Sequence, residues 1–267
     1  MDKVEKSFLE YFQIEKIDDN TFAIKEDKIG YKANCFLLLN NGEGMLIDAL
    51  SGVYQGFIDS LEHIFNVRIR KLYLTHAHYD HFGGYDKNKI EEVYVSKYEL
   101  NNLKNYYLTD EYVQKEMLWD GTTIFPSNFD VSNYKVKKIP NANIVPKQII
   151  FGKRTLEVIE TPGHSKGSIS FYDITNRYLF TGDFLYEGDI DLCEDPTSSK
   201  TDYLNSLMKI IDLDITKLLC GHNEPTINLQ DFSLKDFCQK VQKIISSKAQ
   251  KYQVPGFNIT LLLNKDC

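Results

Sequence analysis

The sequence predicts an α+β protein in which two β-sheets are faced by helices on their outer sides. Short apolar runs of strand length occur together with longer segments whose apolar residues recur at helical spacing. Four of the strand-like runs are followed within a few positions by a side chain that can bind a metal. This pattern is expected of a sheet that carries ligands on the loops at its strand ends.

The N-terminal part of the chain predicts three strands and a helix after a polar, frayed or helical start. The strands are expected at residues 21–25, 33–39 and 44–47, and Asn40-Asn41-Gly42 is typical of a hairpin turn between the last two. Residues 53–66 carry apolar side chains at the spacing of a helix with one buried face.

The middle of the chain, residues 96–120, predicts helices, and Ser96 with Glu99 fits a capping box. Aromatic and soft apolar side chains gather in this segment, and they either pack in the core or line a substrate cleft. Core packing is the favoured interpretation, because aromatic residues at helical spacing usually point inward. These residues are Tyr106, Tyr107, Tyr112, Met117, Leu118 and Trp119.

The C-terminal part predicts further strands and two helices. Strands are expected at residues 155–159, 168–172, 178–180 and 257–263, and helices at residues 201–211 and 232–246. The first of these helices is amphipathic, with a predicted buried stripe formed by Leu204, Leu207, Met208 and Ile211.

The most informative stretch is the motif His76-Ala77-His78-Tyr79-Asp80-His81, which follows a strand-like run at residues 71–74 and precedes two glycines. It holds three of the six histidines of the chain. A regular strand would divide these side chains between two faces, so a loop is the expected host. Imidazole together with carboxylate favours a hydrolytic or redox metal site over a structural one, which is usually rich in cysteine.

Three downstream positions extend the motif. His164, Asp183 and His222 each follow an apolar run, and together with the motif they leave only His63 unused among the histidines. Singly, each could be a surface residue or a turn. His63 lies in the helical segment at residues 53–66, where a surface or packing role is favoured.

On these residues the chain resembles the metallo-β-lactamase superfamily, whose His-x-His-x-Asp-His motif and later His, Asp and His occur here in the family's order, over a region from about residue 21 to the C-terminus. The resemblance implies an αββα four-layer sandwich. It also implies one metal held by His76, His78 and His164, a second held by Asp80, His81 and His222, and Asp183 bridging both. Asp48 matches a family aspartate that supports the motif loop by hydrogen bonding.

Such a site implies two divalent metal ions, zinc in the first place, with iron or manganese as alternatives. Metals of this kind lower the pKa of bound water toward 7, which favours attack on an ester-like carbonyl. We interpret Asp80 and Tyr186 as the catalytic side chains. Tyr186 stands at the offset from Asp183 at which lactone-cleaving relatives carry a tyrosine, and it either donates a hydrogen bond to the oxyanion or packs at a strand end.

Within the superfamily the chain is most similar to glyoxalase-II-like and acyl-CoA thioesterases, which implies cleavage of a thioester or related ester. A β-lactamase is disfavoured because Asp183 stands where those relatives tend to have Cys or Ser. Alternatives are a lactonase, a phosphodiesterase, a persulfide-type dioxygenase with one iron, and a non-catalytic scaffold.

Length and charge limit the partners. We expect a single domain spanning residues 1–267, with a helical insertion at about 87–150, because the candidate ligands extend from His76 to His222. The net charge of −7 argues against a nucleic-acid surface, so a small acyl substrate is expected, and a homodimer stays open. The polar N-terminus, the absence of a long apolar run and the five cysteines without a Cys-x-x-Cys pair predict a cytoplasmic protein with reduced thiols and no membrane span.

Overall fold

The computed structural model describes residues 2–119, 121–245 and 250–263. The chain divides into two compact units, unit 1 at residues 1–145 and unit 2 at residues 146–267. Each unit has its own hydrophobic core. The prediction of a single domain across all 267 residues stays a prediction.

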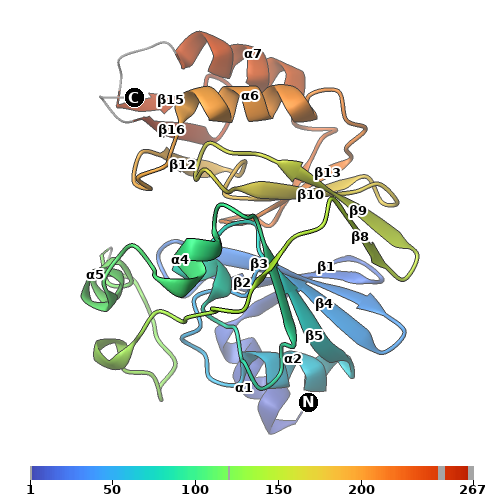
Figure 1. Cartoon of the computed structure of the whole chain (residues 1–267), viewed down its shortest axis with the longest axis vertical. Helices are drawn as coiled ribbons and strands as arrows, with labels where there is room; N and C mark the ends of the chain where they lie inside the picture. The colour runs from blue at the N-terminus through green and yellow to red at the C-terminus, as the bar shows by residue number, and fades with distance from the viewer. Residues whose placement is uncertain (1, 120, 246–249, 264–267) are drawn as a thin grey trace. The chain divides into compact units, whose positions relative to one another are not determined.

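Unit 1 contains a seven-stranded sheet whose strands follow one another in sequence order, as Figure 1 shows in blue to green. The first four strands pair antiparallel and the last four pair parallel. The strands are β1 (Gln13–Asp18), β2 (Thr21–Glu26), β3 (Ala33–Asn40), β4 (Glu43–Ile47), β5 (Arg68–Tyr73), β6 (Glu92–Val95) and β7 (Asn143–Ile144). The expected strands at 21–25, 33–39 and 44–47 are confirmed, whereas β1, β6 and β7 were not anticipated.

The hairpin between β3 and β4 is confirmed. Asn40 pairs with Glu43, so Asn41 and Gly42 form a two-residue turn. Their φ angles are 48° and 80°, and positive φ at both central residues is what the tight hairpin turn requires. Asn and Gly adopt this conformation at low cost.

Helices α1 (Lys3–Tyr11) and α2 (Phe57–Phe65) pack on this sheet, and Phe8 of α1 stacks on Phe57 of α2 with 6.1 Å between ring centroids. Asp2 caps α1 by accepting hydrogen bonds from the amides of Val4 and Glu5. The helix predicted at 53–66 begins only at Phe57, because Gly56 at its N-cap has a φ of 74°.

Residues 96–120 form two short helices, α4 (Leu100–Lys104) and α5 (Asp110–Glu116), and a single 3₁₀ turn follows at Val131–Asn133. The predicted capping box is wrong: the N-cap of α4 is Glu99 and not Ser96, and the Ser96 hydroxyl accepts a 3.4 Å hydrogen bond from the Tyr98 amide. The aromatic segment has a mixed role, since Met117 is fully buried while Trp119 is 75% exposed. Residue 120, the predicted end of this segment, lies outside the described part.

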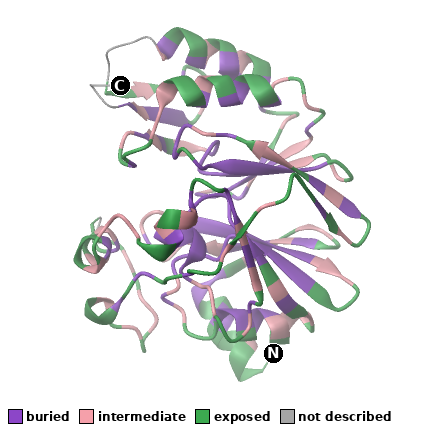
Figure 2. Ribbon diagram, in the orientation of Figure 1, coloured by how far each residue is buried: buried purple, intermediate pink, exposed green. Residues whose placement is uncertain are grey.

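Unit 2 contains a six-stranded sheet in the order β14-β13-β11-β10-β9-β8 and a separate three-stranded sheet in the order β12-β16-β15. The smaller sheet was not anticipated. Figure 1 shows helices α6 (Lys200–Ile210) and α7 (Leu234–Ile244) side by side in this unit, and Figure 2 shows that both carry exposed as well as buried residues. The strands are β8 (Gln148–Phe151), β9 (Arg154–Glu160), β10 (Ile169–Asp173), β11 (Tyr178–Gly182), β12 (Gly188–Leu192), β13 (Lys217–Cys220), β14 (Thr226–Asn228), β15 (Lys251–Gln253) and β16 (Ile259–Leu263).

The predicted buried stripe of α6 is confirmed in part. Leu207 is fully buried and Leu204 and Ile211 pack partly buried against the core, whereas Met208 is 51% exposed and was wrongly included. The other buried residues of the helix are Tyr203, Ser206 and Ile210. Tyr203 fixes this face because its ring packs 5.3 Å from the ring of Phe184, and its Cβ would lie 2.6 Å from any Cβ placed on Gly163. The tyrosine was overlooked because its polar hydroxyl hides a largely apolar side chain. The expected helix at 232–246 is confirmed over Leu234–Ile244, and residue 246 lies outside the described part.

Two further observations concern the remaining predictions. No helix among the described residues is long and apolar enough to cross a membrane. The cysteines of the described part, Cys35, Cys193, Cys220 and Cys238, all carry free thiols.

Candidate metal centre

The motif in unit 1 begins where β5 ends. His76 and His78 lie on the connection after Tyr73, while Asp80 and His81 lie in the one-turn helix α3 (Tyr79–Phe82). The prediction of a loop therefore holds for the first two side chains only. His76 and His81 are almost fully buried, and their ring centroids lie 4.2 Å apart, so the short helix turns His81 back toward His76.

Asp48 holds this connection in place, as expected. It follows β4, which pairs parallel with β5, so both strands deliver their carboxyl ends to the same edge of the sheet. The Thr75 amide donates to Asp48 Oδ1 over 2.8 Å, and the Thr75 hydroxyl donates to Oδ2 over 2.8 Å. His81 Nδ1 lies 2.9 Å from the same Oδ2.

These contacts fix which ring nitrogen of two histidines carries a lone pair. A carboxylate only accepts hydrogen bonds, so His81 Nδ1 is protonated and its Nε2 presents a lone pair when the ring is neutral. The Thr75 hydroxyl donates its hydrogen bond to Asp48 and therefore accepts one from His76 Nδ1 over 3.1 Å. Nε2 of a neutral His76 ring thus also presents a lone pair. Hydrogen-bond partners of this kind orient metal-bound imidazoles.

His78 is the half-buried member of the set, and its partner comes from outside the motif. The Tyr107 hydroxyl lies 3.4 Å from His78 Nε2, and the two ring centroids are 6.0 Å apart. Tyr107 lies between α4 and α5, in the aromatic segment that the sequence singled out without assigning this contact.

In unit 2, His164, Asp183 and His222 follow β9, β11 and β13. These three strands run in the same direction, because β9 and β11 are both antiparallel to β10 and β11 is parallel to β13. Their carboxyl ends therefore lie at one edge of the six-stranded sheet. Gly221 precedes His222, and a Cβ there would lie 2.8 Å from Asp183 Oδ1, so a glycine lets the two connections approach.

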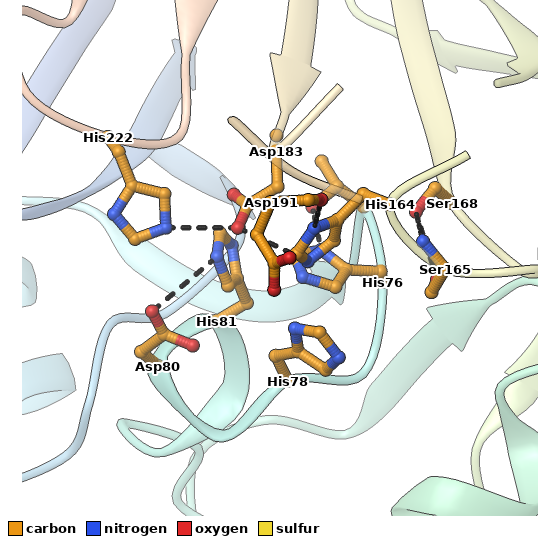
Figure 3. Close-up of polar contacts among 12 residues, drawn as sticks. His76, His78, Asp80, His81, His164, Ser165, Ser168, Asp183, Asp191 and His222 are labelled. Atoms are coloured by element: carbon orange, nitrogen blue, oxygen red, sulfur yellow. Dashed lines mark hydrogen bonds and ion pairs between the residues drawn. The ribbon is translucent and has the colours of Figure 1, made fainter. Parts of the chain in front are cut away.

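Both histidines of unit 2 face one carboxylate oxygen. His222 Nε2 lies 3.1 Å and His164 Nε2 lies 3.4 Å from Asp183 Oδ2, and Figure 3 shows these side chains around Asp183. His164 Nδ1 donates to the Asp191 carbonyl over 2.8 Å. Its neutral ring therefore directs a lone pair at Asp183, and two lone pairs face each other only at a cost unless a cation lies between them. This donor set fits a divalent metal.

Residues 30–222 match the family model of the metallo-β-lactamase superfamily. The chain belongs to this superfamily. Its members are metal-dependent hydrolases that bind divalent metals, and its fold, an α+β sandwich, agrees with the sheets and helices described above.

The chain is similar to a thioesterase and to a hydroxyacylglutathione hydrolase. The chain is 30% identical to the acyl-coenzyme A thioesterase MBLAC2 of Gallus gallus over 234 residues, which cover 81% of this chain and 82% of that protein. It is 23% identical to the hydroxyacylglutathione hydrolase GloC of Haemophilus influenzae, over 73% of this chain and 88% of that protein. Among solved structures, the B3 metallo-β-lactamase BLEG-1 matches with a TM-score of 0.56 and 25% identity, over 75% of this chain and 91% of that one.

The structure also gives the contacts of Tyr186 and His63, two residues considered in the sequence analysis. The Tyr186 hydroxyl donates to the Asp189 carbonyl over 2.6 Å, and the ring centroid lies 5.2 Å from that of His222. Its role as an oxyanion donor stays a prediction. His63 lies on α2 and forms an ion pair with Asp2, with half of its side chain exposed, so the expected surface role is confirmed.

Sequence reasoning missed Thr75, Tyr107 and Asp191 as partners of the candidate ligands. Thr75 directly precedes His76 in the sequence. Its contact with Asp48, however, depends on the parallel pairing of β4 and β5, which the sequence does not show. Asp191 acts through its backbone carbonyl, which no residue type marks in a sequence.

Proposed function

We propose that this protein is a thioesterase with two metal ions, held by the ligands of both units. In this proposal His76, His78 and His164 hold one metal, Asp80, His81 and His222 hold the second, and Asp183 bridges the two. The observation that carries the proposal is the direction of the imidazole nitrogens: Nδ1 of His81 and of His164 is occupied by a hydrogen-bond acceptor, so Nε2 of each is available to a metal. A single domain spanning residues 1–267 follows from the shared site.

Bound divalent cations lower the pKa of water toward 7 and polarise a substrate carbonyl. Zinc suits the three-histidine set, and iron and manganese are the alternatives. The part of the protein is to orient the side chains that would bind the metals. Asp48 holds His81, and the Asp191 carbonyl holds His164. In this proposal Asp80 would bind the metal with one carboxylate oxygen and accept a proton with the other.

A thioester is the favoured substrate class because a thiolate leaves more readily than an amide nitrogen and needs no well-placed general acid. Tyr186 is the candidate donor, and its hydroxyl would have to release the Asp189 carbonyl to reach an oxyanion. The net charge of −7 disfavours a polyanionic polymer as substrate. A thioesterase and a hydroxyacylglutathione hydrolase among the similar proteins support the same class.

The test is a substrate panel run on the metal-loaded protein and on the variant Tyr186→Phe. The panel contains acyl thioesters, lactones, a chromogenic phosphodiester and a cephalosporin. We expect thioesters to be cleaved fastest, and the Tyr186 variant to retain most of this activity because its hydroxyl is bound elsewhere. Activity confined to the phosphodiester would contradict the proposal, and a lactone preference that collapses in the variant would identify a lactonase.

Metal content separates hydrolysis from oxidation. Two metal ions per chain that support hydrolysis agree with the proposal, whereas one iron per chain together with thiol-dependent oxygen uptake would indicate a persulfide-type dioxygenase. A chain that binds no metal would indicate a scaffold. We further propose a cytoplasmic location, which fractionation of the source cells would test.

A further inference from the structure

Unit 1 contains a cleft of about 600 Å³ that none of the candidate ligands lines. This volume lies in the range of small-molecule sites. Its lining includes three glycines, Gly52, Gly83 and Gly84, two tyrosines, Tyr54 and Tyr85, and three lysines, Lys87, Lys137 and Lys138.

The three lysines are exposed, and within the described residues none of them forms an ion pair or a side-chain hydrogen bond. Nearby Lys89 behaves differently, because it pairs with Asp59 and Glu62 on α2. The one acidic residue that lines the cleft is Asp86, and its Oδ1 already accepts from the Asn88 amide over 2.8 Å. In a protein of net charge −7, an uncompensated positive cleft is suited to an anionic ligand.

The cleft is joined to the metal motif through the backbone. Gly83 directly follows α3, the helix that carries Asp80 and His81. The Ala49 amide donates to the His81 carbonyl over 2.7 Å, and the Gly84 amide donates to the Ala49 carbonyl over 2.9 Å. A Cβ on Gly83 would lie 1.9 Å from the Ser51 carbonyl oxygen, so this side of the cleft and the motif helix form one packed layer.

We propose that this cleft binds the phosphorylated nucleotide end of a coenzyme-A thioester, an assignment that rests on the proposed thioesterase function. The ammonium groups of Lys87, Lys137 and Lys138 would neutralise the phosphates. The ring of Tyr85 offers an aromatic surface against which a purine can pack. A coenzyme-A thioester is long enough to carry its phosphates far from its acyl group, whereas a glutathione thioester has no phosphate for this cleft.

The experiment compares one substrate with and without the phosphates. The double variant Lys137→Glu/Lys138→Glu and wild type, both metal-loaded, are given a medium-chain acyl-coenzyme A and the matching acyl-N-acetylcysteamine thioester. We expect KM for the acyl-coenzyme A to rise at least about tenfold in the double variant with kcat unchanged, because charge-assisted phosphate contacts are lost. The N-acetylcysteamine thioester should show the same kinetics with both proteins.

Lys235→Glu is the control, since Lys235 is also an exposed lysine but lies on α7 in unit 2. It should leave both substrates unaffected, and thermal melting should show that all variants fold. An unchanged KM for acyl-coenzyme A in the double variant would overturn the assignment. So would an equal rise in KM for the control, which would show a general effect of charge.

Calorimetry with free coenzyme A and with adenosine 3′,5′-bisphosphate separates this proposal from the proposed function. Both compounds should bind wild type and bind the double variant at least about tenfold more weakly. If wild type hydrolyses neither thioester but the double variant still loses coenzyme A binding, the thioesterase proposal fails and the cleft is supported. If the bisphosphate alone loses binding while the acyl-coenzyme A kinetics stay the same, the cleft takes a free nucleotide and the substrate assignment is wrong.

Discussion

Asp48 binds three groups of the motif connection through its one carboxylate. It has a φ of 60°, an uncommon conformation for a side chain other than glycine or asparagine. That conformation lets one carboxylate receive the Thr75 amide, the Thr75 hydroxyl and His81 Nδ1. Loss of the carboxylate would release the connection that carries His76 and would free the orientation of His81.

We therefore predict that Asp48→Ala weakens metal binding by about 10- to 100-fold, the range found when partners of metal ligands are removed. Competition with a chromophoric chelator measures the affinity of each variant. Asp86→Ala is the control, because the Asp86 carboxylate accepts from the Asn88 amide and not from a candidate ligand, so its loss should leave metal affinity unchanged. Equal affinities for Asp48→Ala and wild type would show that the motif holds its shape without this carboxylate.

Glu26 is a second informative residue, because it is fully buried in unit 1. Burial raises the pKa of its carboxyl from 4.5 to about 7, with a smaller contribution from the charge of Asp80 and an opposing one from the Ser51 amide. A raised pKa means that the folded state binds the proton more tightly than the unfolded state. The protonated carboxyl thus stabilises the fold fully below about pH 4.5, and this contribution is lost as the pH rises through about 7.

Glu26→Gln should therefore stabilise the protein at pH 8 by at least about 1 kcal/mol and change its stability little at pH 5. Glutamine resembles the protonated acid and keeps an oxygen for the Ser51 amide, which donates to Glu26 Oε2 in the wild type. Urea unfolding at the two pH values gives the free energies, with Glu43→Gln on the exposed hairpin as control. A variant that is less stable than wild type at pH 8 would contradict this prediction.

Among the elements, the short helix α3 depends on a glycine at its end. Gly83 has ordinary helical angles, with φ −59° and ψ −32°, so its backbone conformation would accept alanine. Space is the constraint, because a Cβ would lie 1.9 Å from the Ser51 carbonyl oxygen.

Gly83→Ala should cost on the order of 3 kcal/mol of stability, since backbone must move to relieve the contact. Gly56→Ala is the opposite case: its φ of 74° disfavours alanine, but nothing lies within 4 Å of the added Cβ. That variant should cost only about 1 kcal/mol. Urea unfolding measures the free energy of unfolding of both variants. A smaller loss for Gly83→Ala than for Gly56→Ala would show that residues 51–52 and 83 can move apart to admit the methyl group.

Elements with a local signal could be predicted from the sequence, and elements that depend on distant pairing could not. Asn41-Gly42 imposes its turn through positive φ, so β3 and β4 were found. Strand β16 was expected at residues 257–263, and it forms a hairpin with the preceding strand β15. Strand β12 instead pairs in parallel with β16, some seventy positions later, so no local turn marks it in the sequence. Tyr203 was left out of the predicted stripe of α6, because it packs directly against Gly163, and sequence spacing does not show this close approach.

The candidate site shows the same division. His76, His78, Asp80 and His81 are close in sequence, so their common role could be predicted from spacing alone. His164, Asp183 and His222 lie at one sheet edge because β9, β11 and β13 run in the same direction, a fact of topology. Their assignment from sequence therefore required the family resemblance.

For the whole molecule, the distribution of buried residues predicts how it responds to metal removal. Each unit has an extensive apolar cluster of its own, and Figure 2 shows buried residues in purple along the strands of both units. Those clusters stabilise the fold through burial of apolar surface, which requires no metal. Metal adds stability only through its preference for the folded state.

Chelation should therefore lower the melting temperature without abolishing cooperative unfolding. Ligand in 100- to 1,000-fold excess over its dissociation constant contributes about 3 to 4 kcal/mol, which corresponds to a shift on the order of 10 °C for a chain of this size. Calorimetry of the metal-loaded and chelated protein measures the shift, and return of the original melting temperature on adding zinc excludes damage by the chelator. A chelated protein without any cooperative transition would show that the two cores do not suffice and that metal is required for folding.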